Sequence, residues 1–112
     1  MYTITREQAG NFLNYYVLGS PLEMSCYMAL PKIFENVDSL YDDEKAKKHA
    51  ASLAIVINNN HPSNDGEYNK AIWIMAMARA YANFLNDCHN NGRFLNPGSF
   101  YLLCIIIAKG VN

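Results

Sequence analysis

Histidine and cysteine are the side chains that most often carry metal or nucleophilic chemistry, and this chain has three of each. His49 falls in a helix-like segment, His61 in a polar stretch, and His89 directly follows Cys88. No pair has the short, regular spacing of a zinc site. A cysteine nucleophile also needs a base oriented by a third group, which no motif here supplies. We therefore predict no metal ion, no cofactor and no catalytic residues, which favours a non-enzymatic protein.

Carboxylates and glycine loops give no stronger catalytic signal. Asp42, Asp43 and Glu44 are contiguous, so they spread around a first helical turn instead of converging on a substrate. Negative charge at that position is explained by the helix dipole. No GxGxxG, GxxxxGK[ST] or GxSxG pattern is present, so a phosphate-binding loop or a nucleophile elbow is unsupported.

The basic cluster of the chain consists of Lys45, Lys47 and Lys48. On a helix these side chains spread over a wide arc, which is typical of a solvated face. Their alternative role is contact with phosphates, as in a small nucleic-acid-associated regulator. The formal net charge is −1, and the acids at 42–44 would repel the same phosphates. We therefore do not expect a nucleic-acid partner.

Aromatic and methionine side chains provide the remaining functional signal. The chain has eight Tyr, five Phe and one Trp, and tyrosine suits interfaces because its ring is apolar while its hydroxyl stays hydrated. Several of these residues fall beside or off the apolar stripes of their segments and could line a partner surface: Tyr2, Tyr15, Tyr41, Tyr101, Met24 and Met28. The alternative is ordinary partial burial of the same side chains.

Apolar residues recur at helical spacing along most of the chain, so helices are the elements expected to position these side chains. Thr5 is the expected N-cap of a first helix, whose apolar stripe runs from Ala9 to Val17 and which Gly19 should close.

A second helix is predicted immediately after the first. Ser20, Pro21 and Glu23 form the pattern of a capping box with proline at the first helical position. Pro31 should stop or kink this helix, because proline lacks an amide proton and disfavours the helical conformation of the residue before it.

Two longer helices should follow. The third is expected from about Leu40 or Asp43 to about Ile57, and the polar stretch 58–66 should form a loop. The fourth, about 67–89, has no polar face over two turns, which predicts a central helix buried on nearly all sides.

The C-terminal segment at 99–109 is ambiguous, because its aromatic and β-branched residues also suit a strand. We favour a helix capped by Ser99 and closed by Gly110, since a lone strand would have no partner. The sequence therefore predicts an all-α protein, a single domain over 1–112, in a compact bundle of about five helices.

Compartment and assembly follow from the cysteines and the longest apolar run. Cys26, Cys88 and Cys104 are an odd, widely spaced set, which indicates free thiols in a reducing cytoplasm. No secretory signal is visible, and the run from Phe100 to Ala108 is too short to span a membrane. Because one small chain would not fully cover that run, self-association is expected.

Taken together, these features favour a small cytoplasmic protein-binding module, such as an adaptor, an inhibitor or an immunity-type partner of another protein. The small size and the many asparagines would suit a phage, plasmid or bacterial source. The alternatives are the nucleic-acid regulator described above, and a small-ligand sensor or enzyme with a pocket near Trp73 and the 58–66 loop.

Overall fold

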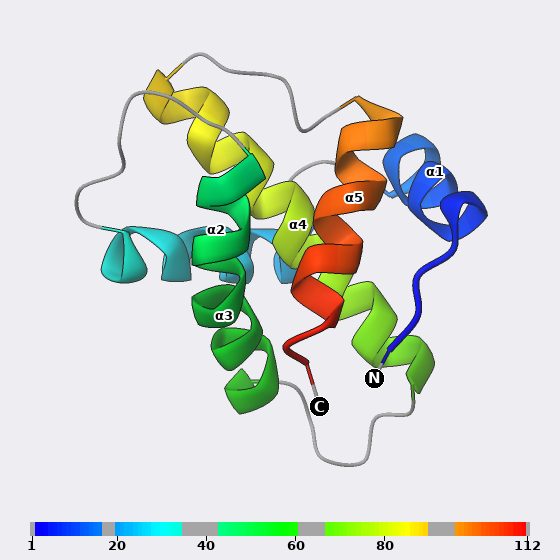
Figure 1. Ribbon diagram of the computed structural model, residues 1–112, viewed down its shortest axis with the longest axis horizontal. Helices are drawn as coiled ribbons and strands as arrows, with labels where there is room; N and C mark the ends of the chain where they lie inside the picture. The colour runs from blue at the N-terminus through cyan, green and yellow to red at the C-terminus, as the bar shows by residue number, and fades with distance from the viewer. Residues whose placement is uncertain (1, 17–19, 35–42, 61–66, 90–95, 112) are drawn as a thin grey trace.

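Five helices make up the regular structure of the described part of the chain (Figure 1). The computed structural model describes residues 2–16, 20–34, 43–60, 67–89 and 96–111, without the side chains of 32, 33, 43–46, 67–69 and 86–89. The helices are α1 (Arg6–Tyr15), α2 (Pro21–Ile33), α3 (Asp43–Asn60), α4 (Glu67–His89) and α5 (Pro97–Ala108). No strand occurs in the described ranges, so the predicted all-α fold is confirmed and 99–108 is helical.

The first helix begins as predicted but ends early. Thr5 caps it with a complete capping box, in which the Thr5 hydroxyl accepts from the Gln8 amide at 3.1 Å and the Gln8 side chain accepts from the Thr5 amide at 2.9 Å. The helix ends at Tyr15, because Tyr16 is already extended. The expectation that it runs on to a stop at Gly19 is therefore wrong, and Gly19 itself lies outside the described residues.

The second helix starts at its predicted cap but continues past its proline. The Ser20 hydroxyl accepts from the Glu23 amide at 3.3 Å, while the Glu23 carboxylate contacts α4. Pro31 lies inside the helix, which ends at Ile33. A stop at Pro31 itself is wrong, because the Phe34 amide donates to the Leu30 carbonyl at 2.9 Å and closes a last turn that does not need a proline amide. The alternative of a kink at Pro31 stays a prediction.

The third helix includes the three asparagines that were expected to begin a loop. It ends at Asn60, three residues beyond the predicted end. Asparagine side chains donate hydrogen bonds to backbone carbonyls near this end. The Asn60 side chain donates to the Val56 carbonyl at 2.7 Å, and the Asn58 side chain donates to the Gly110 carbonyl at 3.3 Å. These bonds extend the helix over residues that the composition alone placed in a loop. The rest of the expected loop, 61–66, lies outside the described residues.

The last helix has a different cap from the one predicted. Asn96, not Ser99, is the N-cap, and its side chain accepts from the Gly98 and Ser99 amides while Pro97 occupies the first turn. Gly110 is needed for close packing, because a Cβ there would lie 2.9 Å from the Cβ of Ala54 in α3.

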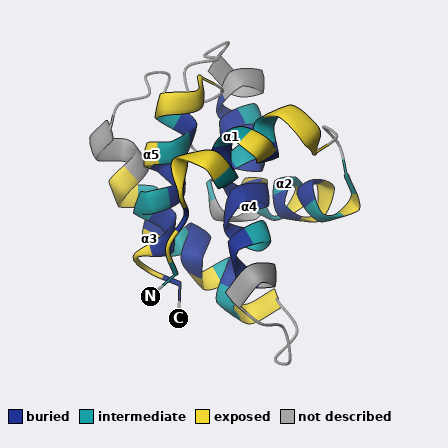
Figure 2. Ribbon diagram, turned by 90° about the vertical axis from the view of Figure 1, so that its right-hand side faces the viewer, coloured by how far each residue is buried: buried dark blue, intermediate teal, exposed yellow. Residues whose placement is uncertain are grey.

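The core forms where α4 and α5 meet the other helices. α4 packs against α2, α3 and α5, and α5 packs against α1, α3 and α4. Residues 74–78 of α4 are all buried, as its unbroken apolar pattern predicts, and much of α4 is coloured buried in Figure 2. The radius of gyration is 12.6 Å, close to the roughly 13 Å typical of a compact domain of this size.

Candidate functional site

The described side chains on one side of α2 are exposed and uncharged. Pro21, Met24, Ser25, Met28 and Pro31 recur three and four residues apart, so they share one side of the helix, and all five are exposed. Met24 is 48% and Met28 67% exposed. We call these five residues the α2 face. The solvent side of a helix usually carries charged and polar residues, whereas this one has a single hydroxyl group among apolar side chains.

The acidic residue of α2 points the other way, into the protein. Glu23 is only 3% exposed. Its carboxylate lies 3.7 Å from Nε of Arg79 in α4 and accepts a hydrogen bond from the Asn83 side chain at 2.8 Å. Arg79 also donates to the Tyr16 carbonyl at 2.6 Å. These contacts connect the end of α1 and the start of α2 to α4. Because they hold Glu23 against α4, they also determine which side of α2 faces the solvent.

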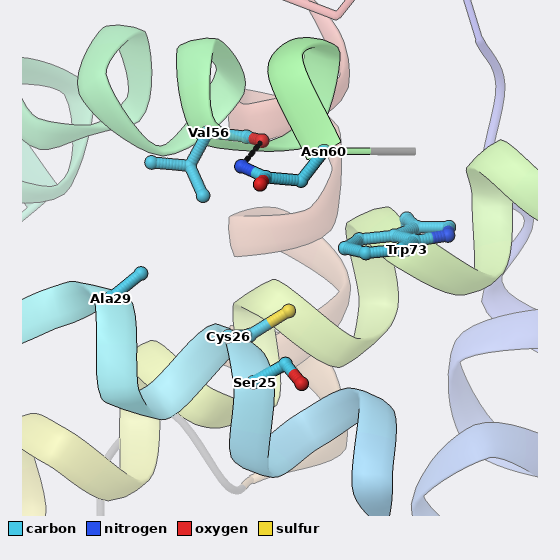
Figure 3. Close-up of a pocket in the computed structure, with 6 residues that line it drawn as sticks. All are labelled: Ser25, Cys26, Ala29, Val56, Asn60 and Trp73. Carbon is cyan, nitrogen blue, oxygen red and sulfur yellow. Dashed lines mark hydrogen bonds between the residues drawn. The ribbon is translucent and has the colours of Figure 1, made fainter. Parts of the chain in front are cut away.

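A cavity of about 230 Å³ adjoins the α2 face (Figure 3). It is lined by Ser25, Cys26 and Ala29 from α2, Val56 and Asn60 from α3, and Trp73 from α4. Figure 3 shows the Cys26 sulfur and the Ala29 methyl group directed from α2 toward α3, with the indole at one end. We call this the Trp73 cavity. Ser25 belongs to both the cavity and the α2 face, so the two are continuous.

The chemistry of the Trp73 cavity suits binding better than catalysis. Burial, together with the negative charge of Glu23, raises the pKa of the Cys26 thiol from 9.0 to about 12. At neutral pH this thiol is protonated, and the thiol is a much weaker nucleophile than the thiolate. The Asn60 amide is bonded to the Val56 carbonyl on the cavity wall.

His49 is the histidine whose side chain the structure describes, and its ring packs against other aromatic side chains. Nδ1 of His49 is hydrogen-bonded to the Tyr81 hydroxyl at 2.8 Å, and its ring centroid lies 4.2 Å from that of Phe34. Within the described residues, no three His, Cys, Asp or Glu side chains come together as a metal-binding group. His61 and the side chain of His89 lie outside the description.

The tyrosines named as candidate binding residues have different environments. Tyr15, at the end of α1, is 78% exposed. Tyr101 is half-buried, with the Arg6 guanidinium 4.9 Å from its ring centroid, and Tyr2 is half-buried, with the Lys70 ammonium at the same distance. These two rings are therefore partly covered by cations. Tyr41 lies outside the described residues.

The candidate methionines and lysines separate onto two helices. Met24 and Met28 lie together on the α2 face. Lys47 and Lys48 are exposed on α3, where the side chain of Lys45 is not described.

Sequence reasoning missed the two prolines of the α2 face, the inward position of Glu23 and the place of Cys26 in a cavity wall. One signal in the sequence could have indicated the apolar outer side of α2, because no charged residue occurs between Met24 and Pro31.

Comparison with known proteins assigns this chain to no family. No protein-family model, curated protein or solved structure matches it. Among the described helices, none is both long enough and apolar enough to cross a membrane.

Proposed function

We propose that this chain is a small, non-enzymatic protein-binding module that contacts its partner through the α2 face. The observation that carries the proposal is the orientation of α2, whose acidic residue Glu23 is buried while Met24 and Met28 are exposed. Burying a carboxylate costs free energy, even when it is paired. A helix whose outer side served solubility alone would carry its charge outward, so the apolar outer side is better explained by a partner.

The side chains of the α2 face suit a protein interface. Methionine is flexible and polarisable, so a methionine pair can adapt to the shape of a partner surface. Protein interfaces commonly gain most of their affinity from a few side chains that fill pockets near the centre of the contact. The Trp73 cavity adjoins the methionines through Ser25 and offers such a pocket.

The size of the cavity favours a partner's side chain over a free ligand. Small-molecule sites are usually about 300–1,000 Å³, whereas the Trp73 cavity has about 230 Å³. That volume accommodates one large apolar side chain of a protein that rests on the α2 face. The small-ligand sensor remains the second candidate, because this cavity lies beside Trp73 at the end of α3, where a pocket was expected from the sequence.

The proposed setting is the cytoplasm. Cys26 and Cys104 are buried free thiols, which suit a reducing compartment. The adaptor, inhibitor or immunity-type role and the phage or bacterial source belong to the same proposal. Nucleic acid is a poor partner for the α2 face, because none of its five side chains carries a positive charge.

The test is capture of partners by the purified full chain from its native host, followed by mass spectrometry. We expect a partner that is retained by the wild type and lost from a Met24→Lys/Met28→Lys variant. Lysine and methionine have similar helix propensities, so α2 should stay folded, and circular dichroism checks this. The matched control is Asn14→Lys, which places a lysine at an exposed position of α1, outside the α2 face.

Three results would contradict the proposal. The protein-binding function is wrong if the chain is recovered alone and monomeric over a range of salt concentrations. The assignment to the α2 face is wrong if Asn14→Lys abolishes capture while the methionine variant retains it. A small molecule that binds the wild type and protects Trp73 fluorescence from quenching, with no protein captured, would instead support the sensor.

A further inference from the structure

The Trp73 cavity is apolar in its depth and polar at its mouth. Cys26 is only 2% exposed and belongs to the deep wall, beside the half-buried Ala29. Ser25 and Asn60 line the same cavity but are exposed, so their polar groups lie near solvent. An occupant should therefore be apolar where it is buried and polar where it leaves the cavity.

Both polar side chains at the mouth present an acceptor. The Asn60 amide nitrogen donates to the Val56 carbonyl at 2.7 Å, so this side of the amide must carry the nitrogen and not the oxygen (Figure 3). The amide oxygen points away from that carbonyl, and Figure 3 shows it on the side nearer α2. The Ser25 hydroxyl gives its proton to the Pro21 carbonyl at 3.0 Å, which leaves its oxygen with acceptor lone pairs. A neutral donor at the mouth would match these groups.

The volume of the cavity suits a bicyclic aromatic ring. An apolar cavity of about 150 Å³ holds a benzene molecule, and the Trp73 cavity has about 230 Å³. An aromatic occupant also gains ring contacts with the Trp73 indole, which forms one end of the cavity in Figure 3. A charged occupant is less suitable, because it would lose hydration beside six lining side chains that carry no counter-charge.

We propose that the Trp73 cavity receives a tryptophan side chain of the partner protein, whose indole N–H donates to the Asn60 amide oxygen. This inference rests on the proposed function and deepens it, because it names the side chain that the partner inserts beside the α2 face. Tryptophan is among the residues that most often dominate the affinity of a protein interface.

The position of the donor distinguishes tryptophan from the other aromatic residues. When a tryptophan enters ring-first, the benzene half of its indole goes deepest, and the N–H stays on the half nearer the backbone, close to the mouth. A tyrosine carries its hydroxyl at the far end, where it would meet the apolar wall around Cys26. A phenylalanine has no donor and leaves the Asn60 oxygen to water.

The test titrates two small molecules of the same shape into the isotopically labelled full chain. One is indole with a methyl group where tryptophan carries its backbone, and the other is the matching methylbenzothiophene, in which sulfur replaces the N–H group. Binding is followed by the side-chain N–H signal of Trp73, the single tryptophan of the chain. We expect both molecules to shift this signal, and the methylindole to bind about fivefold more tightly.

Two asparagine variants locate the hydrogen bond. Asn60→Ala removes the amide oxygen, so the preference for methylindole should fall to less than about twofold. The matched control is Asn59→Ala, which makes the same change at an exposed neighbour that does not line the cavity. This control should keep the fivefold preference.

Two alanine positions link the cavity to the partner. Ala29→Leu places a larger side chain in the cavity, so both molecules should cease to bind and capture of the partner should be lost. Ala51→Leu makes the same change at an exposed position of α3 that does not line this cavity, and should preserve both. Leucine is a good helix former, and circular dichroism checks that the helical content is unchanged.

The inference is overturned if neither molecule shifts the Trp73 signal, if the two bind equally well, or if the preference survives Asn60→Ala. It is also overturned if Ala29→Leu captures the partner as well as the wild type does, in which case the α2 face binds without the cavity. If methylindole binds with its preference but no protein is captured, the proposed function is wrong, and a free indole replaces the partner's tryptophan as the occupant.

Discussion

The ion pair between Glu23 and Arg79 allows a direct test of how α2 is oriented. The change is Glu23→Ala, which removes a carboxylate that is 3% exposed, lies 3.7 Å from Nε of Arg79 and accepts from Asn83 at 2.8 Å. The guanidinium then loses its counter-charge in a site where its own side chain is only 11% exposed. We therefore expect a large loss in the free energy of unfolding.

The magnitude follows from the geometry. Two unit charges 3.7 Å apart attract by about 4 kcal/mol at an effective dielectric constant of about 20. Removing one partner of a buried pair typically costs about 3–5 kcal/mol. Nε of Arg79 has no hydrogen-bond partner, so the pair lacks the best geometry, and the partial exposure of Arg79 lets water approach its charge. Both facts point to the lower end, about 3 kcal/mol.

A conservative variant separates charge from hydrogen bonding. Glu23→Gln keeps an oxygen that can accept from Asn83 but also leaves the Arg79 guanidinium without its counter-charge, so its cost should be about 1 kcal/mol smaller than that of Glu23→Ala. Arg79→Leu should be as costly as Glu23→Ala, since it leaves the buried carboxylate unpaired. The double variant Glu23→Ala/Arg79→Leu should cost about 2 kcal/mol less than the sum of the two single changes.

The assay is urea-induced unfolding followed by helical circular dichroism, with the free energy of unfolding extrapolated to water. The account is refuted if Glu23→Ala costs less than about 1 kcal/mol, or if the double variant is additive within about 0.5 kcal/mol. Either result would mean that the pair does not hold α2 in place.

Three further changes test a close contact and two buried polar groups of the fold. Gly110→Ala should destabilise the fold by about 1–3 kcal/mol in urea unfolding, because the new Cβ would lie 2.9 Å from the Cβ of Ala54. Ala54→Gly should restore only part of this loss, since a glycine inside α3 itself costs about 1 kcal/mol. Tyr81→Phe should cost about 1–2 kcal/mol, since it removes the hydroxyl bonded to His49 in a fully buried site; equal thermal stability of the two proteins would contradict this. The pKa of Cys26, near 12 in the folded chain and 9.0 without burial, means that the unfolded chain loses this proton first as the pH rises. The Cys26 contribution to stability is therefore complete below about pH 9 and declines toward pH 12, so the alkaline loss measured by urea unfolding should be smaller in Cys26→Ala.

Local signals in the sequence were enough to predict where most of the helices begin and which of their residues are buried. The caps at Thr5 and Ser20 and the bounds of α4 follow from side-chain types and spacing within a few turns. The same is true of the buried residues of α3, which are Ala50, Leu53, Ala54 and Ile57. The helix ends that were wrong depend on bonds that the composition of a segment does not reveal. Asn58 donates to Gly110, which is 52 residues away, and the turn after Pro31 closes through Leu30 and Phe34.

The candidate sites could be predicted only in part. Met24 and Met28 were identified from their spacing. The Trp73 cavity needs α2, α3 and α4 together, and the close approach of Gly110 to Ala54 joins the end of the chain to α3. Such features combine residues more than 30 positions apart, and helical periodicity has no information at that range.

The sequence by itself determined that the chain forms helices and that Met24, Met28 and Glu23 belong to one of them, because backbone propensity, caps and period are local properties. Only the tertiary structure decided that Glu23 of that helix faces inward. A carboxylate can be buried only where another segment supplies a cation and a donor, and here Arg79 and Asn83 of α4 do so. That pairing turns Glu23 inward and leaves the two methionines in solvent, where the α2 face could meet a partner.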